Sequence, residues 1–540
     1  MTATNLLGAT RFEGAGTHAV RLLRTLAQCP SAALVLMMSS YFGVFATLAT
    51  EQHAGWRSLG FDTAIHDQGI WLTAHGRTPF VTVRGIDYFG HHVNLISLLF
   101  VPIYRLGGGV RELTLIHTAW VALAALPLWL LARDRIGGRG WLALVVPAAY
   151  LLHPATQWIT WWLYHPDSMA ILPLVFAWWL ATRRRWGWFA VAIAVAIACK
   201  EDVALAVVAM GLALAVLRPG GRTLDRAVSG IDGRRRVGGG LLTAAAGLGW
   251  FLLCTRWVIP ARTGASQPFY ESFFPSLGAS PSQIATNAMH HPSRVTHLLG
   301  RDKNGSYLAR MVGPLGLIPI VALPVLAPGL PQLGVNLLVE TVDGATIVSQ
   351  YATLPLVGLL LATVEGLGLI RRRLGPRALR GACGVLAASA ITGSALWGCG
   401  PFSANWANGA WARPPRPEVA TLDRVQRMVP GDAGVAASYD IDAHFSHRVV
   451  DYEWPNPWHS ANYGMDGASF GTPTQVEWII ITAAGAGTRA DLELLDQLLG
   501  PGGGFAEVMN ERGVFVARRI APSLPLAADG RPPTDSVTDP

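Results

Sequence analysis

The sequence is poor in charged residues and almost free of lysine. Charged residues make up 14% of the 540 residues, hydrophobic residues 51%, and the mean hydropathy is +0.35. A soluble enzyme of this length usually carries about a quarter of charged residues, so we expect lipid to be the solvent for most of the chain. Lys200 and Lys303 are the only lysines, and arginine supplies nearly all the positive charge.

Cysteine pairs, repeats and a basic face are also missing. The arginines form short clusters between apolar segments, which disfavours nucleic acid as a partner. The cysteines show no spacing typical of metal sites or disulfides, so we expect small core residues and neither a metal nor another cofactor. They are Cys29, Cys199, Cys254, Cys383 and Cys399.

Apolar segments long enough to cross a bilayer recur along the chain. The first, Ser31–Thr50, follows arginines as a signal peptide would, but further spans follow it, which favours a signal anchor. Residues 31–400 are therefore predicted to form a transmembrane helical domain. The other long segments are Leu113–Ala132, Leu241–Val258, Tyr351–Ile370 and Ala382–Trp397, and shorter ones are Leu142–Leu152 and Ser168–Ala181.

The arginine clusters orient these segments. Under the positive-inside rule the clusters and residues 1–30 are cytoplasmic, and about 11 spans result. Residues 51–110 then form the first outer loop, in which Asn94–Leu106 lies along the membrane surface. In Pro331–Gln350 the carboxylates of Glu340 and Asp343 fall at membrane depth, so a re-entrant segment is as plausible there as a helix. The clusters are Arg133/Arg135/Arg139, Arg183–Arg185, Arg218/Arg222/Arg226/Arg234–Arg236 and Arg371–Arg373/Arg377/Arg380.

The C-terminal part has a different pattern. GDAGVAAS, VEWIIITAAG, DLELLDQLLG and GVFVARRI indicate strand, strand, helix and strand with glycine-rich turns. We therefore expect a small α/β domain over residues 413–520, outside the membrane. Residues 521–540 are rich in proline and aspartate and are predicted to be disordered.

Several unusual polar groups fall on the predicted outer side, the first of them in Phe61–Trp71. In a helix Asp62 and His66 share one face, whereas Asp67 and Trp71 share another. One carboxylate can then point into a site. The alternative is that Asp62 only caps the helix.

Two outer turns carry further polar groups. WWLYHPDSM (Trp161–Met169) contains His165 and Asp167, which membrane anchoring does not require. CKEDV (Cys199–Val203) joins two apolar helices and could be an ordinary exposed turn. Lys200, however, is a compact ammonium in an arginine-rich chain, as a phosphate or carboxylate site would need.

Histidine and tyrosine complete the set. His92 in GHHVN begins an apolar stretch and favours a site, whereas His91 is as easily an interfacial anchor. A weaker group is Ser349–Tyr351 at the outer start of a later span. A membrane-surface pocket of carboxylates, imidazoles and cations suits a phosphorylated lipid substrate, with a carboxylate as base for a hydroxyl.

These motifs, in this order, resemble the DUF2079 family of bacterial polytopic membrane proteins, which is similar to the GT-C superfamily of lipid-linked sugar transferases. The family pattern of an aromatic-Asp start, a Gln and a Trp is matched at Phe61, Asp62, Gln68 and Trp71, and its His at His92. The aromatic-His-Pro-acid element is matched from Tyr164 to Asp167. The Lys-Glu-Asp element is matched at Lys200, Glu201 and Asp202, the later Tyr at Tyr351, and an outer C-terminal element at Ala437–Pro457.

The resemblance implies a GT-C fold and a sugar transferase that uses a polyprenyl-phosphate-linked sugar, among membrane lipids, to modify an envelope glycan or glycoprotein. It implies an acidic base in the first outer loop, which is Asp62 here, with Asp67 as the alternative. His66 and Thr63 depart from the family pattern. Two other functions stay open: a lipid or solute transporter or flippase, and a non-catalytic protein that binds envelope glycan.

Overall fold

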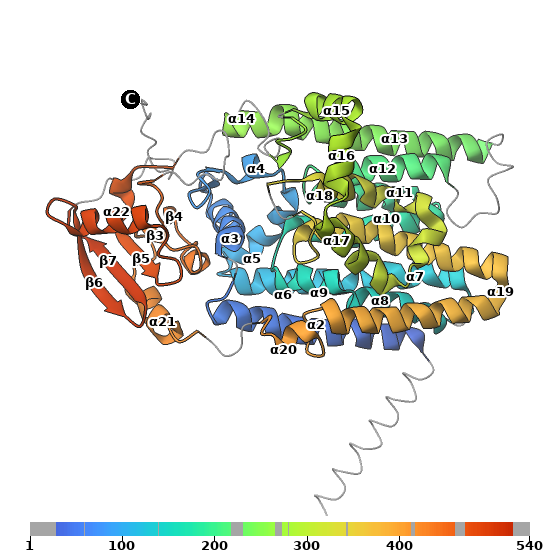
Figure 1. Cartoon of the computed structure of the whole chain (residues 1–540), viewed down its shortest axis with the longest axis horizontal. Coiled ribbons are helices and arrows are strands. Elements are labelled where there is room, and N and C mark those ends of the chain that lie inside the picture. The colour runs from blue at the N-terminus through green and yellow to red at the C-terminus, as the bar shows by residue number, and fades with distance from the viewer. Residues whose placement is uncertain are drawn as a thin grey trace, which may run out of the picture.

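The computed structural model describes residues 29–58, 60–138, 140–217, 231–264, 273–278, 280–341, 344–411, 416–459 and 470–521. A long helical bundle forms most of the molecule, and a small sheet stands at one end of it (Figure 1). Nearly all of the predicted cytoplasmic segment 1–30, nearly all of the predicted tail 521–540, and Asp343 lie outside the described residues.

Five described helices are long and apolar enough to cross a membrane, and a bent pair would make a sixth. The pair joins Leu142–Leu152 to Pro154–Trp161 at an angle of 45°. The chain is thus mainly helical, as predicted, whereas the total of about 11 spans stays a prediction. The candidate spans are Pro30–Ala54 (α2), Val110–Ile136 (α6, Val110–Leu123, and α7, Ala125–Ile136), Arg236–Thr263 (α13, Ile231–Leu253, to α14, Ile259–Thr263), Ile318–Leu338 (to the end of α18, Leu330–Leu338) and Gln350–Trp397 (α19, Thr353–Trp397).

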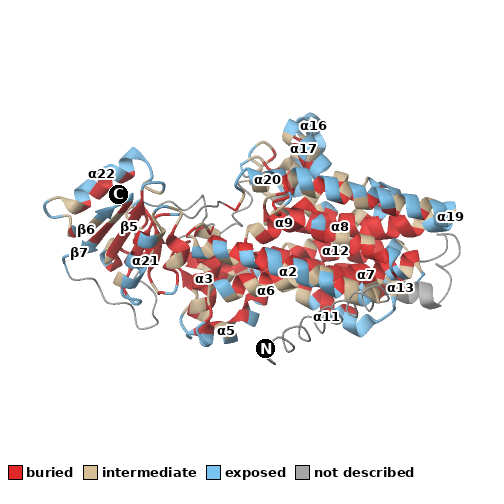
Figure 2. Cartoon of the chain, turned by 90° about the horizontal axis from the view of Figure 1, so that it is seen from below, coloured by how far each residue is buried: buried red, intermediate tan, exposed pale blue. Residues whose placement is uncertain are grey.

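Helix α19 forms the centre of the bundle. Gly375, with a φ of +85°, and Pro376 interrupt it, and its two halves turn back on each other. Both halves contact the segment from Gly316 to Ile318. In the first half, a Cβ on Gly366 would lie 2.8 Å from the Ile318 carbonyl, and in the second half Val385 faces Gly316. The first half of this hairpin is buried, and Figure 2 shows the exposed end of α19 in pale blue.

The remaining helices are short. Residues Leu95–Phe100 and α5 (Val101–Arg105) form a short apolar helical segment with exposed Leu98, Leu99 and Leu106, and its position along the membrane surface stays a prediction. The others are α3 (Gly60–Ala74), α4 (Tyr88–His91), α8 (Val145–Leu152), α9 (Pro154–Trp161), α10 (Ile171–Thr182), α11 (Trp186–Ile197), α12 (Val203–Val216), α15 (Pro281–His290), α16 (Pro292–Leu299), α17 (Asp302–Val312) and α20 (Ala404–Ala407), beside a hairpin of β1 (Phe80–Val81) and β2 (Ile86–Asp87).

Two carboxylates in or next to the candidate spans have hydrogen-bond partners. Glu365 accepts two hydrogen bonds of 2.8 Å from Arg135 and one of 3.2 Å from Trp178. Glu340 lies beyond the end of α18, where its carboxylate accepts hydrogen bonds from Ser276. Helix α18 ends at Leu338, so Glu340 follows this helix, and its position at membrane depth stays a prediction.

The C-terminal residues form a five-stranded mixed sheet in the order β4-β3-β5-β7-β6. Strand β3 is parallel to β4 and β5, and β7 is antiparallel to β5 and β6. Apolar residues of α21 pack on one face and those of α22 on the other, so both faces of the sheet are covered. The elements are α21 (Val419–Met428), β3 (Val435–Ala437), β4 (Asp451–Glu453), β5 (Trp478–Thr482), α22 (Arg489–Leu499), β6 (Phe505–Glu511) and β7 (Val514–Arg519).

Candidate functional site

Helix α3 brings a carboxylate against an imidazole from a distant loop. Asp62 Oδ2 lies 3.4 Å from His165 Nε2, and the Asp62 side chain is 34% exposed. The His66 ring stands nearly perpendicular to the His165 ring at 5.5 Å. Because α3 begins at Gly60, Asp62 lies inside the first turn and is not the N-cap residue. Asp62 is thus an accessible carboxylate beside a buried histidine.

A buried ammonium lies next to this pair. Lys200 Nζ is 3.2 Å from Asp167 Oδ1 and 3.1 Å from Asp202 Oδ2, and its side chain is only 9% exposed. Asp202 is the more exposed carboxylate at 31%. In the turn between α11 and α12, the ammonium of Lys200 therefore lies between two carboxylates. Asp202 belongs to the same turn, and Asp167 comes from the segment before α10.

His92 and Glu201 form a second pair on the same side. His92 Nδ1 lies 2.8 Å from Glu201 Oε1, and the Val93 amide donates to Glu201 Oε2 at 3.0 Å. His92 also interacts electrostatically with Lys200, Asp202 and Asp62. The structure thus gathers His92 and the CKEDV turn at one end of the bundle.

Tyr351 reaches the same cluster from the start of the central hairpin. Its hydroxyl lies within electrostatic range of Lys200, Asp62 and Asp167. Its backbone carbonyl accepts a hydrogen bond of 2.8 Å from Asn336 of α18. Segments from five parts of the sequence therefore meet around Asp62 and Lys200.

The surroundings set the charges in this cluster. Partial burial opposes ionisation of Asp62, but His165, His66 and His91 lower its pKa to about 2. Burial lowers the pKa of His66 well below its ordinary value, so this ring is neutral. Burial raises the pKa of Asp167 to about 6, although Lys200 opposes the shift. At neutral pH Asp62 is thus an ionised carboxylate that can accept a hydrogen bond.

Asp67 and Gln68 of the same helix contact the C-terminal part of the chain instead. Asp67 is fully buried and accepts hydrogen bonds of 2.6 Å from Tyr104 and Ser446, and His447 Nε2 lies 3.0 Å away. Gln68 donates to Thr82 at 2.8 Å and to the Arg448 carbonyl at 3.2 Å. This face of α3 joins the first loop to the C-terminal part.

A buried hydrogen-bond chain behind the cluster was not predicted from the sequence. His66 Nδ1 is 3.1 Å from the Tyr88 hydroxyl, which is 2.9 Å from Ser97 Oγ. Ser97 Oγ is in turn 3.0 Å from the Tyr164 hydroxyl. Tyr164 belongs to a motif singled out above, but Tyr88 and Ser97 lie among ordinary interfacial residues and gave no signal. The chain fixes the His66 ring that packs on His165.

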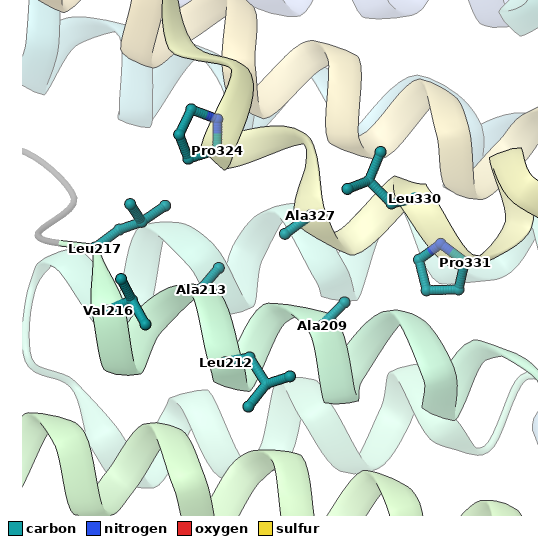
Figure 3. A pocket seen from close by; sticks show the side chains of 9 residues that line it. All are labelled: Ala209, Leu212, Ala213, Val216, Leu217, Pro324, Ala327, Leu330 and Pro331. Atoms are coloured by element: carbon teal, nitrogen blue, oxygen red, sulfur yellow. The ribbon is translucent and has the colours of Figure 1, made fainter. Parts of the chain in front are cut away.

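An apolar hollow lies away from this cluster. An apolar groove of about 550 Å³ runs between α12 and the segment from Pro324 to Pro331 (Figure 3). Its wall carries Leu212, Ala213 and Val216, which are far along α12 from Lys200. In the described part of the chain no three His, Cys, Asp or Glu side chains are arranged to hold a metal ion.

Comparisons with known proteins identify the family and the fold. A family model described as "Predicted membrane protein (DUF2079)" matches residues 54–515. No curated protein matches the sequence. The crystal structure of ArnT from Cupriavidus metallidurans bound to undecaprenyl phosphate superposes with a TM-score of 0.51 at 12% identity, over 93% of this chain and 100% of that chain. ArnT is a GT-C glycosyltransferase, so the predicted GT-C-like fold is confirmed. The chain belongs to the DUF2079 family of membrane proteins.

Proposed function

We propose that this protein is a membrane glycosyltransferase that moves a sugar from a polyprenyl-phosphate donor to an acceptor of the cell envelope. The observation that carries the proposal is the accessible, ionised Asp62 within the same cluster as the buried Lys200. The ArnT structure with the same fold holds undecaprenyl phosphate, which supports a polyprenyl phosphate as the lipid part of the donor. The donor sugar and the acceptor are left open.

Asp62 is the proposed base. Its carboxylate accepts the proton of the acceptor hydroxyl, and the hydroxyl oxygen forms a bond to the anomeric carbon of the sugar. The bond between that carbon and the phosphate oxygen breaks with its electron pair, and polyprenyl phosphate leaves. Asp67 is a weaker candidate, because three side chains already occupy its buried carboxylate.

The cationic side of the cluster is the proposed phosphate site. Lys200 would hold the phosphate by replacing its contact with Asp202, the more exposed of its two carboxylates. Asp167 keeps the ammonium in place from the buried side. His92 and Glu201 fix the turn next to Lys200, and His165 and Tyr351 border the space between the phosphate and Asp62.

Topology is part of the proposal. Residues 1–30 would be cytoplasmic, about 11 spans would follow, and residues 413–520 would form an extracytoplasmic α/β domain next to the site. Alkaline phosphatase is active only outside the cytoplasm, so fusions test this order. A fusion after Arg184 should be inactive and one after Ile520 active. The opposite result would reverse the orientation of the site.

The reaction is tested by Asp62→Asn. This change keeps the side-chain size and removes the base, so transfer from a polyprenyl-phosphate sugar should fall by about 10²–10⁴-fold. Asp496→Asn, on the exposed face of α22, is the matched control and should keep full activity. Mass spectrometry of lipid-linked sugars in a strain lacking the protein should first name the donor that accumulates.

The same variant separates transfer from transport. A flippase would translocate a labelled polyprenyl-phosphate sugar across liposomes whether or not Asp62 can accept a proton. Translocation by the Asp62→Asn protein at the wild-type rate, with no transfer by the wild type, would contradict the proposed reaction. The paired state of Glu365 leaves this carboxylate without the open position that transported ions use.

A further inference from the structure

A second polar pocket lies on the flank of the bundle, apart from the Asp62–Lys200 cluster. It has a volume of about 500 Å³ beside α16 and the segment that follows α18. Figure 1 shows α15, α16 and α17 crossing this flank, and Figure 2 shows α16 and α17 standing out from the bundle with exposed surface. The polar side chains of the pocket are Ser276, Ser293, Arg294, His297, Arg301 and Glu340.

Arg301 forms a rigid wall of this pocket. Its Nε donates to the Leu298 carbonyl at 2.9 Å, and its Nη2 donates to the carbonyls of Leu337 and Val339 at 2.8 and 3.0 Å. These carbonyls end α16 and α18, where no helical partner remains for them. The guanidinium is therefore held in place before any ligand arrives.

The opposite wall is built around Ser276. Glu340 Oε1 accepts hydrogen bonds from the Ser276 amide at 3.0 Å and from its hydroxyl at 2.7 Å. Arg294 Nη1 donates to the Ser276 carbonyl at 3.1 Å. Arg294 and His297 are both exposed, so they can reach a ligand in the pocket.

The charges favour an anion. Two guanidinium groups and one carboxylate line the pocket, and a guanidinium N–H can donate a charge-assisted hydrogen bond to a phosphate oxygen. The carboxylate of Glu340 can accept from a hydroxyl or ammonium group of the same molecule. A phosphate ester with a polar substituent meets both requirements.

The position of the pocket indicates that this phosphate ester belongs to a membrane lipid. Apolar Met289 and Leu299 are exposed on the same short helices, at 73% and 43%. Asn336 directly precedes Leu337, whose carbonyl holds Arg301, and it donates to the Tyr351 carbonyl, which places the pocket on the flank near the end of the bundle that carries the cluster. Amphipathic helices with exposed apolar side chains at the end of a bundle lie at the headgroup level of a membrane.

We infer that this pocket is a binding site for the phosphate-bearing headgroup of a membrane lipid. The site is separate from the proposed donor site and does not depend on a transfer reaction. Arg294 and His297 contact the headgroup, Arg301 shapes the pocket, and the acyl chains lie along Met289 and Leu299.

Native mass spectrometry of the full-length protein tests the site. Phosphatidylglycerol is titrated into the detergent-purified protein, with diacylglycerol of the same chains as the lipid without phosphate. The double substitution Arg294→Gln and His297→Gln should lower phosphatidylglycerol retention at least about 10-fold, because it removes the charge-assisted contacts. Arg310→Gln, on the exposed face of α17, is the matched control and should retain the lipid as the wild type does.

Two further measurements test the assignment, one with a Glu340 variant and one with a soluble phosphate ester as competitor. Glu340→Gln keeps an oxygen for Ser276 and removes the negative charge, so it should bind phosphatidylglycerol at least as tightly as the wild type. Soluble glycerol 3-phosphate should not displace the lipid, because it brings no acyl chains. Retention by the double variant equal to that of Arg310→Gln, loss in Glu340→Gln, or displacement by glycerol 3-phosphate would each overturn the assignment.

Discussion

Asp62 and His165, which lie in distant parts of the sequence, meet with 3.4 Å between carboxylate oxygen and imidazole nitrogen. His66 packs edge-on against the same imidazole, and its own ring is held by Tyr88. This contact ties α3 to the loop before α10. It also keeps a carboxylate ionised next to the cationic turn at Lys200.

The first prediction concerns His165→Gln. His165 and the neighbouring histidines hold the pKa of Asp62 at about 2 against the effect of burial, so removing the imidazole should raise that pKa. The Asp62 carboxylate is ionised at pH values above its lowered pKa, and activity is lost as the pH falls through that pKa and the carboxylate is protonated. The acid limb of the pH–rate profile for sugar transfer should therefore move to higher pH. His75→Gln, an exposed histidine just after α3, should leave the limb unchanged.

The second prediction concerns the two lysines. Lys200→Met leaves Asp167 and Asp202 without their buried cation, which should destabilise the protein by about 3–5 kcal/mol. Since burial already raises the pKa of Asp167 to about 6, protonation relieves part of this loss at low pH. Thermal unfolding in detergent should show a larger fall in Tm at pH 8 than at pH 5. Lys303→Met on α17 should show no such pH dependence.

The third prediction concerns the contact between α3 and the C-terminal part. Asp67 raises the pKa of His447 against the effect of burial, and His447, Ser446 and Tyr104 lower the pKa of Asp67. The stabilisation from His447 is present below its ordinary pKa of about 6.5 and is lost as pH rises through the raised value. The stabilisation from Asp67 is present above the ordinary pKa of an aspartate and is lost as the pH falls through the lowered pKa of Asp67.

Protease digestion between the two parts measures this contact. Cleavage of the wild type should be slowest between about pH 4 and pH 6.5 and should accelerate on the alkaline side. His447→Gln removes the titrating group, so its alkaline acceleration should disappear. An unchanged pH profile in this variant would show that the ion pair does not control docking.

The fourth prediction compares two ion pairs of the bundle. Glu365→Gln breaks a buried, bidentate pair with Arg135 and should cost about 3–5 kcal/mol, because the guanidinium is left buried without its counter-charge. Asp134→Asn breaks the pair with Arg183, which is 54% exposed, and should cost less than about 1 kcal/mol. Tm measurements on both purified variants check the difference. Equal losses would mean that burial does not decide the strength of these pairs.

Much of the architecture follows from the sequence because a bilayer restricts what a backbone can do. Apolar length predicted the long candidate spans, whereas the position of Asn94–Leu106 along the membrane surface stays a prediction. The charged turn at Lys200 was visible because ionisable residues rarely interrupt apolar helices. The short helices α15–α17 were not predicted, because moderately polar segments carry no length signal.

The sequence by itself determined that the chain forms a mainly helical membrane fold and which polar residues are unusual in it. Only the tertiary structure decided which aspartate of α3 lies in the cluster and which one contacts the C-terminal part. Asp62 and Asp67 are both aspartates on one helix, but one faces His165 and is partly exposed, whereas the other is sealed against Ser446 and His447. Helical periodicity separates their directions but does not say what each direction meets, since that depends on contacts between segments hundreds of residues apart.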